Sequence, residues 1–144
     1  MTAGYSGTPL GRKLGIRPGA LVALIGSPRA AISRVVARLE ATLDPGTRLR
    51  TDLRARGEHD VIVAFVRSEP ELRRHFERAR GRLTPAGGLW VACPKQSSPI
   101  ATGLKESHVR AYGLSTGLVD NKVCAIDEDW SGLRFVVRKA DRNR

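Results

Sequence analysis

Cysteine and aromatic residues are scarce in this sequence of 144 residues, which has two cysteines and seven aromatics. Cys93 and Cys124 stand apart in apolar segments, without CxxC spacing or clustered histidines, so neither a disulfide framework nor a zinc site is indicated. We expect both thiols to be buried and reduced, as in a cytoplasmic protein. The aromatic residues do not alternate with basic ones, which argues against a base-stacking platform for nucleic acid.

Long apolar runs are also missing. No apolar run is longer than residues 20–25, which is far shorter than the roughly 20 residues that a membrane-spanning helix needs. The first part of the chain scatters glycine, proline and basic residues and contains no apolar core of the length that a signal peptide requires. We therefore expect no membrane association and a cytoplasmic location.

Acidic residues are few relative to basic ones, and the formal net charge is +11, with 20 arginines and 5 lysines. Such a charge can attract polyanions. The arginines are spread along the whole chain with acids among them, and no nucleic-acid-binding module accompanies them. A preference for arginine over lysine is also what a GC-rich genome tends to produce. Weak, non-specific nucleic-acid binding therefore stays an alternative and is not the main prediction.

The sequence does contain several short apolar runs separated by helical patterns. Residues 20–25, 61–66 and 89–93 are continuous runs without alternation, which is typical of strands buried on both faces. Further strands are predicted over residues 47–51, 118–126 and 133–137.

Two serines mark the starts of helices. Ser27 precedes Pro28, and Ser68 stands three positions before Glu71, arrangements typical of an N-cap and of a capping box. Apolar residues at helical spacing follow each serine: Ile32, Val35, Val36 and Leu39 after the first, and Leu72, Phe76, Ala79 and Leu83 after the second. A third helix is predicted over residues 105–112. The arginines between residues 73 and 82 are expected to face solvent.

Helices separate the strands through the middle of the chain, and two strands follow each other at its end. This order predicts a three-layer α/β/α domain with a mostly parallel sheet of about six strands and an antiparallel C-terminal strand pair. We expect residues 1–144 to form one domain, with the turn-rich residues 1–18 as an arm packed on it.

Residues 83–91 read Leu-Thr-Pro-Ala-Gly-Gly-Leu-Trp-Val and resemble the LxPGGxLwv stretch of Rossmann-fold S-adenosylmethionine methyltransferases, which precedes their fifth strand. In that family a glycine-rich loop follows the first strand, and an acid that ends the second strand binds the cofactor ribose. Here only Gly26 remains of the first feature, and Asp52 is the only acid near the second. The interval from Arg48 to Asp60 is also too short for the helix, strand and loop that shape the adenine site. The resemblance therefore implies a truncated methyltransferase-like Rossmann fold without a cofactor, and S-adenosylmethionine is disfavoured.

A second set of short segments is spread over nearly the whole chain: YSGTPL at residues 5–10, LGI at 14–16, RPG at 17–19, PK at 94–95, GLVD at 117–120, KVCAID at 122–127 and WSGL at 130–133. Together they resemble a small, uncharacterised bacterial family, a domain of unknown function. This resemblance implies a Rossmann-like, methyltransferase-like fold and brings no assigned reaction.

Ligands of open parallel sheets bind beyond the carboxyl ends of the strands. Five candidate residues follow predicted strands: Gly26, Ser27, Arg67, Ser68 and Lys95. Helix N-termini and basic side chains can together hold a phosphate or carboxylate, which predicts a small-anion or nucleotide site at this edge. Alternatively, the two serines only cap helices and the two basic residues lie in water.

No catalytic or metal-binding residue is predicted. His59, His75 and His108 lie on different elements without a partnered nucleophile, and each is expected at the surface. The main hypothesis is a non-catalytic binding or regulatory module. An enzyme that uses S-adenosylmethionine or a nucleotide is one alternative, and non-specific nucleic-acid binding is another. A homodimer formed through a sheet edge is left open.

Overall fold

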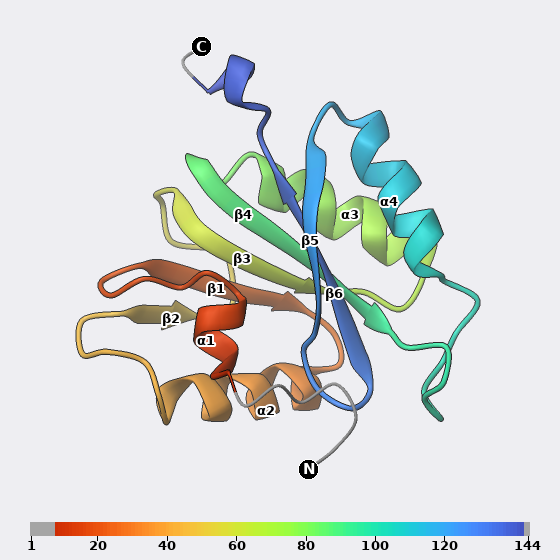
Figure 1. Ribbon diagram of the computed structural model, residues 1–144, viewed down its shortest axis with the longest axis horizontal. Coiled ribbons are helices and arrows are strands. Elements are labelled where there is room, and N and C mark those ends of the chain that lie inside the picture. Colours follow the sequence, from red (N-terminus) through yellow and green to blue (C-terminus); the bar gives the residue numbers. More distant parts are fainter. Residues whose placement is uncertain (1–7, 143–144) are drawn as a thin grey trace.

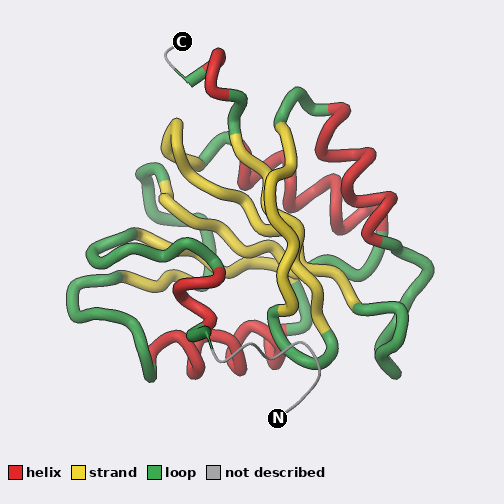
Figure 2. Tube along the Cα trace, in the orientation of Figure 1, coloured by secondary structure: helices red, strands yellow, loops and turns green. Residues whose placement is uncertain are grey.

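The computed structural model describes residues 8–142, in which one six-stranded sheet has helices on both faces (Figures 1 and 2). In chain order the elements are α1 (Leu10–Lys13), β1 (Leu21–Gly26), α2 (Arg29–Glu40), β2 (Arg48–Arg50), β3 (His59–Phe65), α3 (Glu69–Arg80), β4 (Leu83–Pro94), α4 (Glu106–Ser115), β5 (Val119–Ala125), β6 (Trp130–Val136) and the 3-10 turn Lys139–Asp141. The strand order is β2-β1-β3-β4-β6-β5. Strands β1 to β4 pair in parallel, and β6 is antiparallel to both β4 and β5. The predicted fold class is confirmed.

The two faces of the sheet bury two separate apolar clusters. On one face, α1 and α2 cover the sheet with residues such as Leu14 and Ile32, and on the other face α3 and α4 contribute Phe76 and Val109 (Figure 1). Residues 21–25 of β1 and 61–65 of β3 lie between both layers, which explains why these stretches are apolar without alternation. None of the helices within residues 8–142 combines the length and the apolar character of a membrane span.

The predicted N-terminal arm is described from residue 8 onward, and residues 1–7 lie outside the described part of the chain. Within it, Leu10, Leu14 and Ile16 are buried in the same cluster as α2. The indole Nε1 of Trp90 in β4 donates a hydrogen bond to the carbonyl oxygen of Leu14 at 3.0 Å. The segment that follows α1 is therefore attached to the central sheet by apolar packing and by one buried hydrogen bond.

Strand β4 is longer than predicted. The sequence predicts a strand only over residues 89–93 and assigns Leu83 to the preceding helix, yet α3 ends at Arg80 and β4 runs from Leu83 to Pro94. Its first residues are partly exposed, and the register with β3 shifts between His59 and Val61. A proline is tolerated there because it lies at the start of the strand, where no partner requires its missing N–H group.

The connection between β2 and β3 is short and leaves β2 at the edge of the sheet. Residues 51–58 contain no helix or strand. Leu53 is nevertheless buried, in the cluster that also contains Ile25. The guanidinium of Arg82 donates to the carbonyl oxygens of Leu53 at 2.6 Å, of Gly57 at 3.1 Å and of Ala55. The expectation that Arg82 faces solvent is wrong, because its side chain is hydrogen-bonded to the backbone of this loop.

Replacing Arg82 with methionine is expected to lower the free energy of unfolding by about 2 kcal/mol, since three loop carbonyl groups lose a charged donor. Hydrogen exchange of the amides of residues 53–58 should also accelerate. Arg80→Met is the matched control, because Arg80 only approaches Glu77 at the surface, at 3.9 Å. Its cost should stay within about 0.5 kcal/mol. Equal losses in urea unfolding for the two variants would contradict this role of Arg82.

His59 is fully buried at the start of β3, so the expectation of a surface histidine in a loop is wrong. Its backbone N–H donates to the carbonyl oxygen of Arg82 at 2.7 Å, and its ring Nδ1 lies 3.3 Å from the same oxygen. Burial lowers the pKa of His59 below the ordinary 6.5. The nearby charges of Arg50 and Arg82 act in the same direction, and the contact with the Arg82 backbone opposes them.

The protein should lose stability as the pH falls below about 6.5, because His59 in the unfolded chain takes up a proton before the buried ring does. The loss continues until the pH reaches the lower pKa of the folded state. His59→Asn keeps a donor near Arg82 but cannot titrate, so its unfolding free energy should change less between pH 7.5 and pH 5.5, roughly the range in which a histidine changes charge. Urea unfolding at several pH values measures this, and an unchanged slope would rule out His59 as the cause.

Candidate functional site

The carboxyl ends of β1, β3 and β4 lie side by side at one edge of the sheet. Gly26 at the end of β1 pairs with Phe65 at the end of β3, and Phe65 pairs with Ala92 near the end of β4. Ser27, Arg67 and Lys95, which follow these strands, therefore lie along the same edge, as predicted for a parallel sheet.

Ser27, Arg67 and Glu71 form one hydrogen-bonded group, here called the Ser27–Arg67–Glu71 cluster. Arg67 Nη2 donates to Ser27 Oγ at 3.0 Å and to Glu71 Oε2 at 3.4 Å. The backbone N–H of Arg67 donates to Glu71 Oε1 at 2.8 Å, and Ser27 Oγ lies 3.4 Å from Glu71 Oε2. The edge therefore carries a cation and an anion side by side, and not only the basic groups expected from the sequence.

The pKa of Glu71 is lowered. Burial by itself raises the pKa, but the hydrogen bonds and the charge of Arg67 lower it further than burial raises it, and the bond from Ser27 adds to this. Glu71 is therefore a carboxylate at neutral pH. From the sequence, Glu71 was predicted only to take part in the capping box that starts at Ser68. Its pairing with Arg67 was missed, although the spacing of four residues between them is typical of an ion pair.

The other predicted site residues lie close to this cluster or further along the edge. Ser68 is the N-cap of α3, and its Oγ accepts a hydrogen bond from the Glu71 backbone N–H at 3.3 Å. Lys95 follows β4, and its backbone N–H donates to the carbonyl oxygen of Asp129 at 2.9 Å. Binding of an anion by Gly26, Ser27, Arg67, Ser68 and Lys95 stays a prediction.

Ser27 does not cap α2, in contrast to the prediction. The N-cap is Pro28, which makes no side-chain hydrogen bond, and the helix begins at Arg29. The Ser27 hydroxyl is instead turned to the side chains of Arg67 and Glu71. A serine that the local pattern assigned to a helix is therefore part of the strand edge.

Gly26 holds the ends of β1 and β3 in close approach. Its φ is +105°, in the left-handed region that favours glycine. A Cβ atom added at Gly26 would lie 2.1 Å from the backbone oxygen of Phe65. The backbone N–H of Ser27 donates to this same oxygen at 3.3 Å. The position of the cluster thus depends on a residue without a side chain.

The acidic turn between β5 and β6 lies at the same edge. Asp127 Oδ1 accepts hydrogen bonds from the backbone N–H groups of Asp129 and Trp130, at 2.8 and 2.9 Å. Asp129 Oδ1 accepts from Ser98 Oγ at 2.7 Å. The Asp127 carboxylate therefore stabilises the turn itself, and the Asp129 carboxylate connects it to the loop that follows β4. Within residues 8–142, no group of three histidine, cysteine or acidic side chains is arranged to hold a metal ion.

The two cysteines are free. Cys93 is buried in β4, where burial raises its pKa to about 11, with a smaller contribution from the charge of Glu106. Cys124 is half-buried, and burial raises its pKa as well. A protonated thiol is a weak nucleophile, so neither cysteine is suited to thiolate chemistry at neutral pH.

No protein-family model matches the chain, and no curated protein matches its sequence. The resemblance to the small bacterial family consequently stays a prediction. The fold does match solved methyltransferases. A SAM-dependent methyltransferase from Aquifex aeolicus superposes with a TM-score of 0.59 at 12% identity, over 86% of this chain and 85% of that chain.

Two further structures contain the methyl donor. Fibrillarin from Aeropyrum pernix, with natively bound S-adenosylmethionine, gives a TM-score of 0.59 at 14% identity, over 92% of this chain and 70% of that one. The magnesium protoporphyrin IX methyltransferase from Synechocystis, with bound SAM, gives 0.57 at 13% identity, over 89% and 74%.

These structures contradict the expectation that the fold goes without a cofactor, because proteins with this arrangement of strands were crystallised with the methyl donor in place. That expectation rested on the short connection between β2 and β3, which the structure does contain. The chain has the Rossmann-like fold of the SAM-dependent methyltransferases.

Proposed function

We propose that this protein is an S-adenosylmethionine-dependent methyltransferase that binds its cofactor at the carboxyl edge of β1 and β3. The observation that carries this proposal is the fold, whose solved neighbours include methyltransferases with SAM or S-adenosylhomocysteine bound. The alternative of a cofactor-dependent enzyme is thereby preferred to the non-catalytic module.

The groups present at this edge fit the amino-acid end of the cofactor, which carries a carboxylate and an ammonium group. The guanidinium of Arg67 suits the carboxylate, and the Glu71 carboxylate suits the ammonium. The hydroxyl of Ser27 already bonds to both side chains and can donate or accept. The cluster therefore has both charges that a zwitterionic ligand needs.

An acid also stands near the end of β2, where ribose hydroxyls would need an acceptor. Asp52 is exposed, and its Oδ1 accepts the backbone N–H of Arg54 at 3.0 Å. The cofactor supplies an electrophilic methyl group on a positively charged sulfur. The role of the chain is to bind and orient it, with Arg67, Glu71 and Asp52 as the anchoring groups.

Other expectations from the sequence remain open beside this proposal. A cytoplasmic location, homodimerisation through a free sheet edge and weak polyanion binding are predictions that need their own tests. The methyl acceptor must reach the same edge, where Lys95 and the turn at Asp127 lie on the side away from β2.

Binding of S-adenosylhomocysteine tests the proposal without any acceptor, by calorimetry and thermal melting of the full chain. At about 100 times its dissociation constant the ligand should add about 2.7 kcal/mol to the unfolding free energy. Arg67→Met and Glu71→Gln should each weaken binding about tenfold or more, since each leaves a charged group of the ligand without its partner.

Arg73 and Glu69 provide the matched control. They form a pair at 3.3 Å on α3 with the same spacing of four residues, and both side chains are exposed to solvent. Arg73→Met and Glu69→Gln should leave the affinity unchanged. Absence of binding at millimolar ligand, or equal losses in the control variants, would refute a cofactor site at this cluster.

A further inference from the structure

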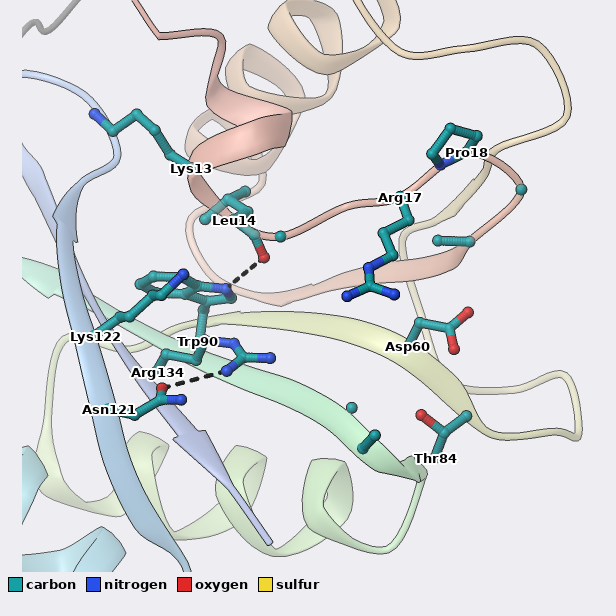
Figure 3. Close-up of a pocket in the computed structure, with 15 residues that line it drawn as sticks. Lys13, Leu14, Arg17, Pro18, Asp60, Thr84, Trp90, Asn121, Lys122 and Arg134 are labelled. Carbon is teal, nitrogen blue, oxygen red and sulfur yellow. Dashed lines mark hydrogen bonds between the residues drawn. The ribbon is translucent and has the colours of Figure 1, made fainter. Parts of the chain in front are cut away.

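A cavity lies at the opposite end of the sheet from the Ser27–Arg67–Glu71 cluster. It has a volume of about 590 Å³ and opens at the amino ends of the parallel strands, between the segment that follows α1 and the strands β5 and β6 (Figure 3). Ala20 before β1, Asp60 in β3 and Thr84 in β4 line it. Its size is in the range of small-molecule sites, about 300–1,000 Å³. The methyl transfer proposed above uses the other edge and gives this cavity no role.

The lining of the cavity is strongly basic. It includes four cationic side chains, from Lys13, Arg17, Lys122 and Arg134. The only acidic residue in the lining is Asp60, whose Oδ2 accepts the backbone N–H of Leu21 at 2.9 Å. Lys13 donates one hydrogen bond to the carbonyl oxygen of Ala125 at 2.9 Å and keeps further donors. A cavity with this charge balance favours an anionic ligand.

Arg134 is half-buried, whereas Arg17 and Lys122 are exposed. Its guanidinium lies against β4 at Gly88, where an added Cβ would be 2.4 Å from Nε and 2.9 Å from Cζ. Nη1 donates to Asn121 Oδ1 at 3.3 Å, as Figure 3 shows. No carboxylate within residues 8–142 lies at ion-pair distance from Arg134. Burial lowers the pKa of Arg134, and the charge of Arg142 adds to this effect.

A half-buried charge without a counter-charge is costly, and a bound anion would remove that cost. The missing side chain at Gly88 gives the guanidinium the space to lie flat on the strand. Arg17 and Lys122 line the same cavity as Arg134, and Figure 3 shows all three side chains. The site thus has the guanidinium of Arg134 in a defined position, together with the exposed side chains of Arg17 and Lys122.

We propose that this cavity binds a small phosphorylated molecule, with its phosphate group held by Arg134, Arg17 and Lys122. A phosphate offers several acceptor oxygens to a guanidinium fork and to an ammonium group. The concave shape favours a small anion over a nucleic acid, whose backbone follows an extended groove. The ligand would act apart from the methyl transfer edge, at the other end of the sheet.

Inorganic pyrophosphate is the probe, titrated into the full chain at constant ionic strength and followed by calorimetry and by amide NMR shifts. We expect saturable binding, with shifts concentrated at residues 13–20, 84–88, 121–122 and 134. Arg134→Met should weaken binding about tenfold. Asp60→Asn keeps an acceptor for the Leu21 N–H but removes the only carboxylate, so it should strengthen binding about threefold.

Arg78→Met on the exposed face of α3 is the matched control and should leave pyrophosphate binding unchanged. S-adenosylhomocysteine binding should be the same in Arg134→Met and in the parent protein, which separates this proposal from the proposed function. Lys122→Met, at an exposed position, gives the same information if Arg134→Met melts early. No saturable binding at about 10 mM, or an equal loss in Arg78→Met, would overturn the proposal. The proposal would also be overturned if a single-stranded oligonucleotide bound more tightly than pyrophosphate and if Arg134→Met left that binding unchanged.

Discussion

Gly26→Ala is expected to destabilise the protein by about 4 kcal/mol or more, which is a large effect for one methyl group. Two costs add together. A side chain at φ +105° is strained, typically by about 1–3 kcal/mol. The new Cβ would also lie 2.1 Å from the Phe65 backbone oxygen. This oxygen belongs to the neighbouring strand and accepts from the Ser27 N–H, so it cannot retreat without breaking the pairing of β1 with β3.

Gly46→Ala separates these two costs. Gly46 has a similarly positive φ, +94°, but an added Cβ would meet no atom within 4 Å. Its replacement should therefore cost only the backbone strain, about 1–2 kcal/mol. Urea unfolding of both variants gives the comparison. If Gly26→Ala costs no more than Gly46→Ala, the close approach of β1 to β3 does not exist in solution.

The change at Gly26 should also remove ligand binding at the carboxyl edge. Any movement of Phe65 away from the new methyl group displaces Arg67, which follows two residues later, and separates it from Ser27. S-adenosylhomocysteine should then give no thermal shift at a concentration where the parent protein is saturated. The same melt with Gly46→Ala should still show the shift, since the turn after α2 is not part of the cluster.

The strands and helices could be predicted where local rules dominate. Residues 21–25 of β1 and 61–65 of β3 lie between the two helical layers, so these stretches are apolar without alternation and indicate strands directly. Ser68 and Glu71 start α3 by a local capping contact that the sequence displays directly. The antiparallel ending followed from two strands that are adjacent in the sequence.

The site was less predictable because its contacts join distant parts of the chain. Ser27 and Glu71 are 44 residues apart, and only the sheet brings them together. Arg82 follows α3 by two residues and resembled the arginines of that helix in the sequence, yet it is bonded to carbonyl groups 25 to 29 residues earlier. Arg134 is a single charged residue between Leu133 and Phe135 in β6, and nothing in the sequence distinguishes it from an exposed arginine. Its neighbour Gly88, on β4, determines its position.

The second large effect is expected at Trp90. Trp90→Ala should lower the free energy of unfolding by about 3–5 kcal/mol, because a fully buried indole in the centre of the sheet is replaced by a void. The neighbours have little freedom to fill it, since a Cβ on Gly132 would already lie 3.0 Å from the Trp90 ring. Trp90→Phe should fill part of the space but leave the Leu14 carbonyl oxygen without its donor.

Trp130 is the matched control for that hydrogen bond. It is buried in the same cluster, 1% exposed compared with 0% for Trp90, but its Nε1 has no hydrogen-bond partner among the described residues. Trp90→Phe should therefore cost about 1–2 kcal/mol more than Trp130→Phe. The excess should appear with faster hydrogen exchange in residues 14–20, the wall of the basic cavity, and with weaker pyrophosphate binding. Equal losses in the two variants would mean that packing alone holds this segment on the sheet.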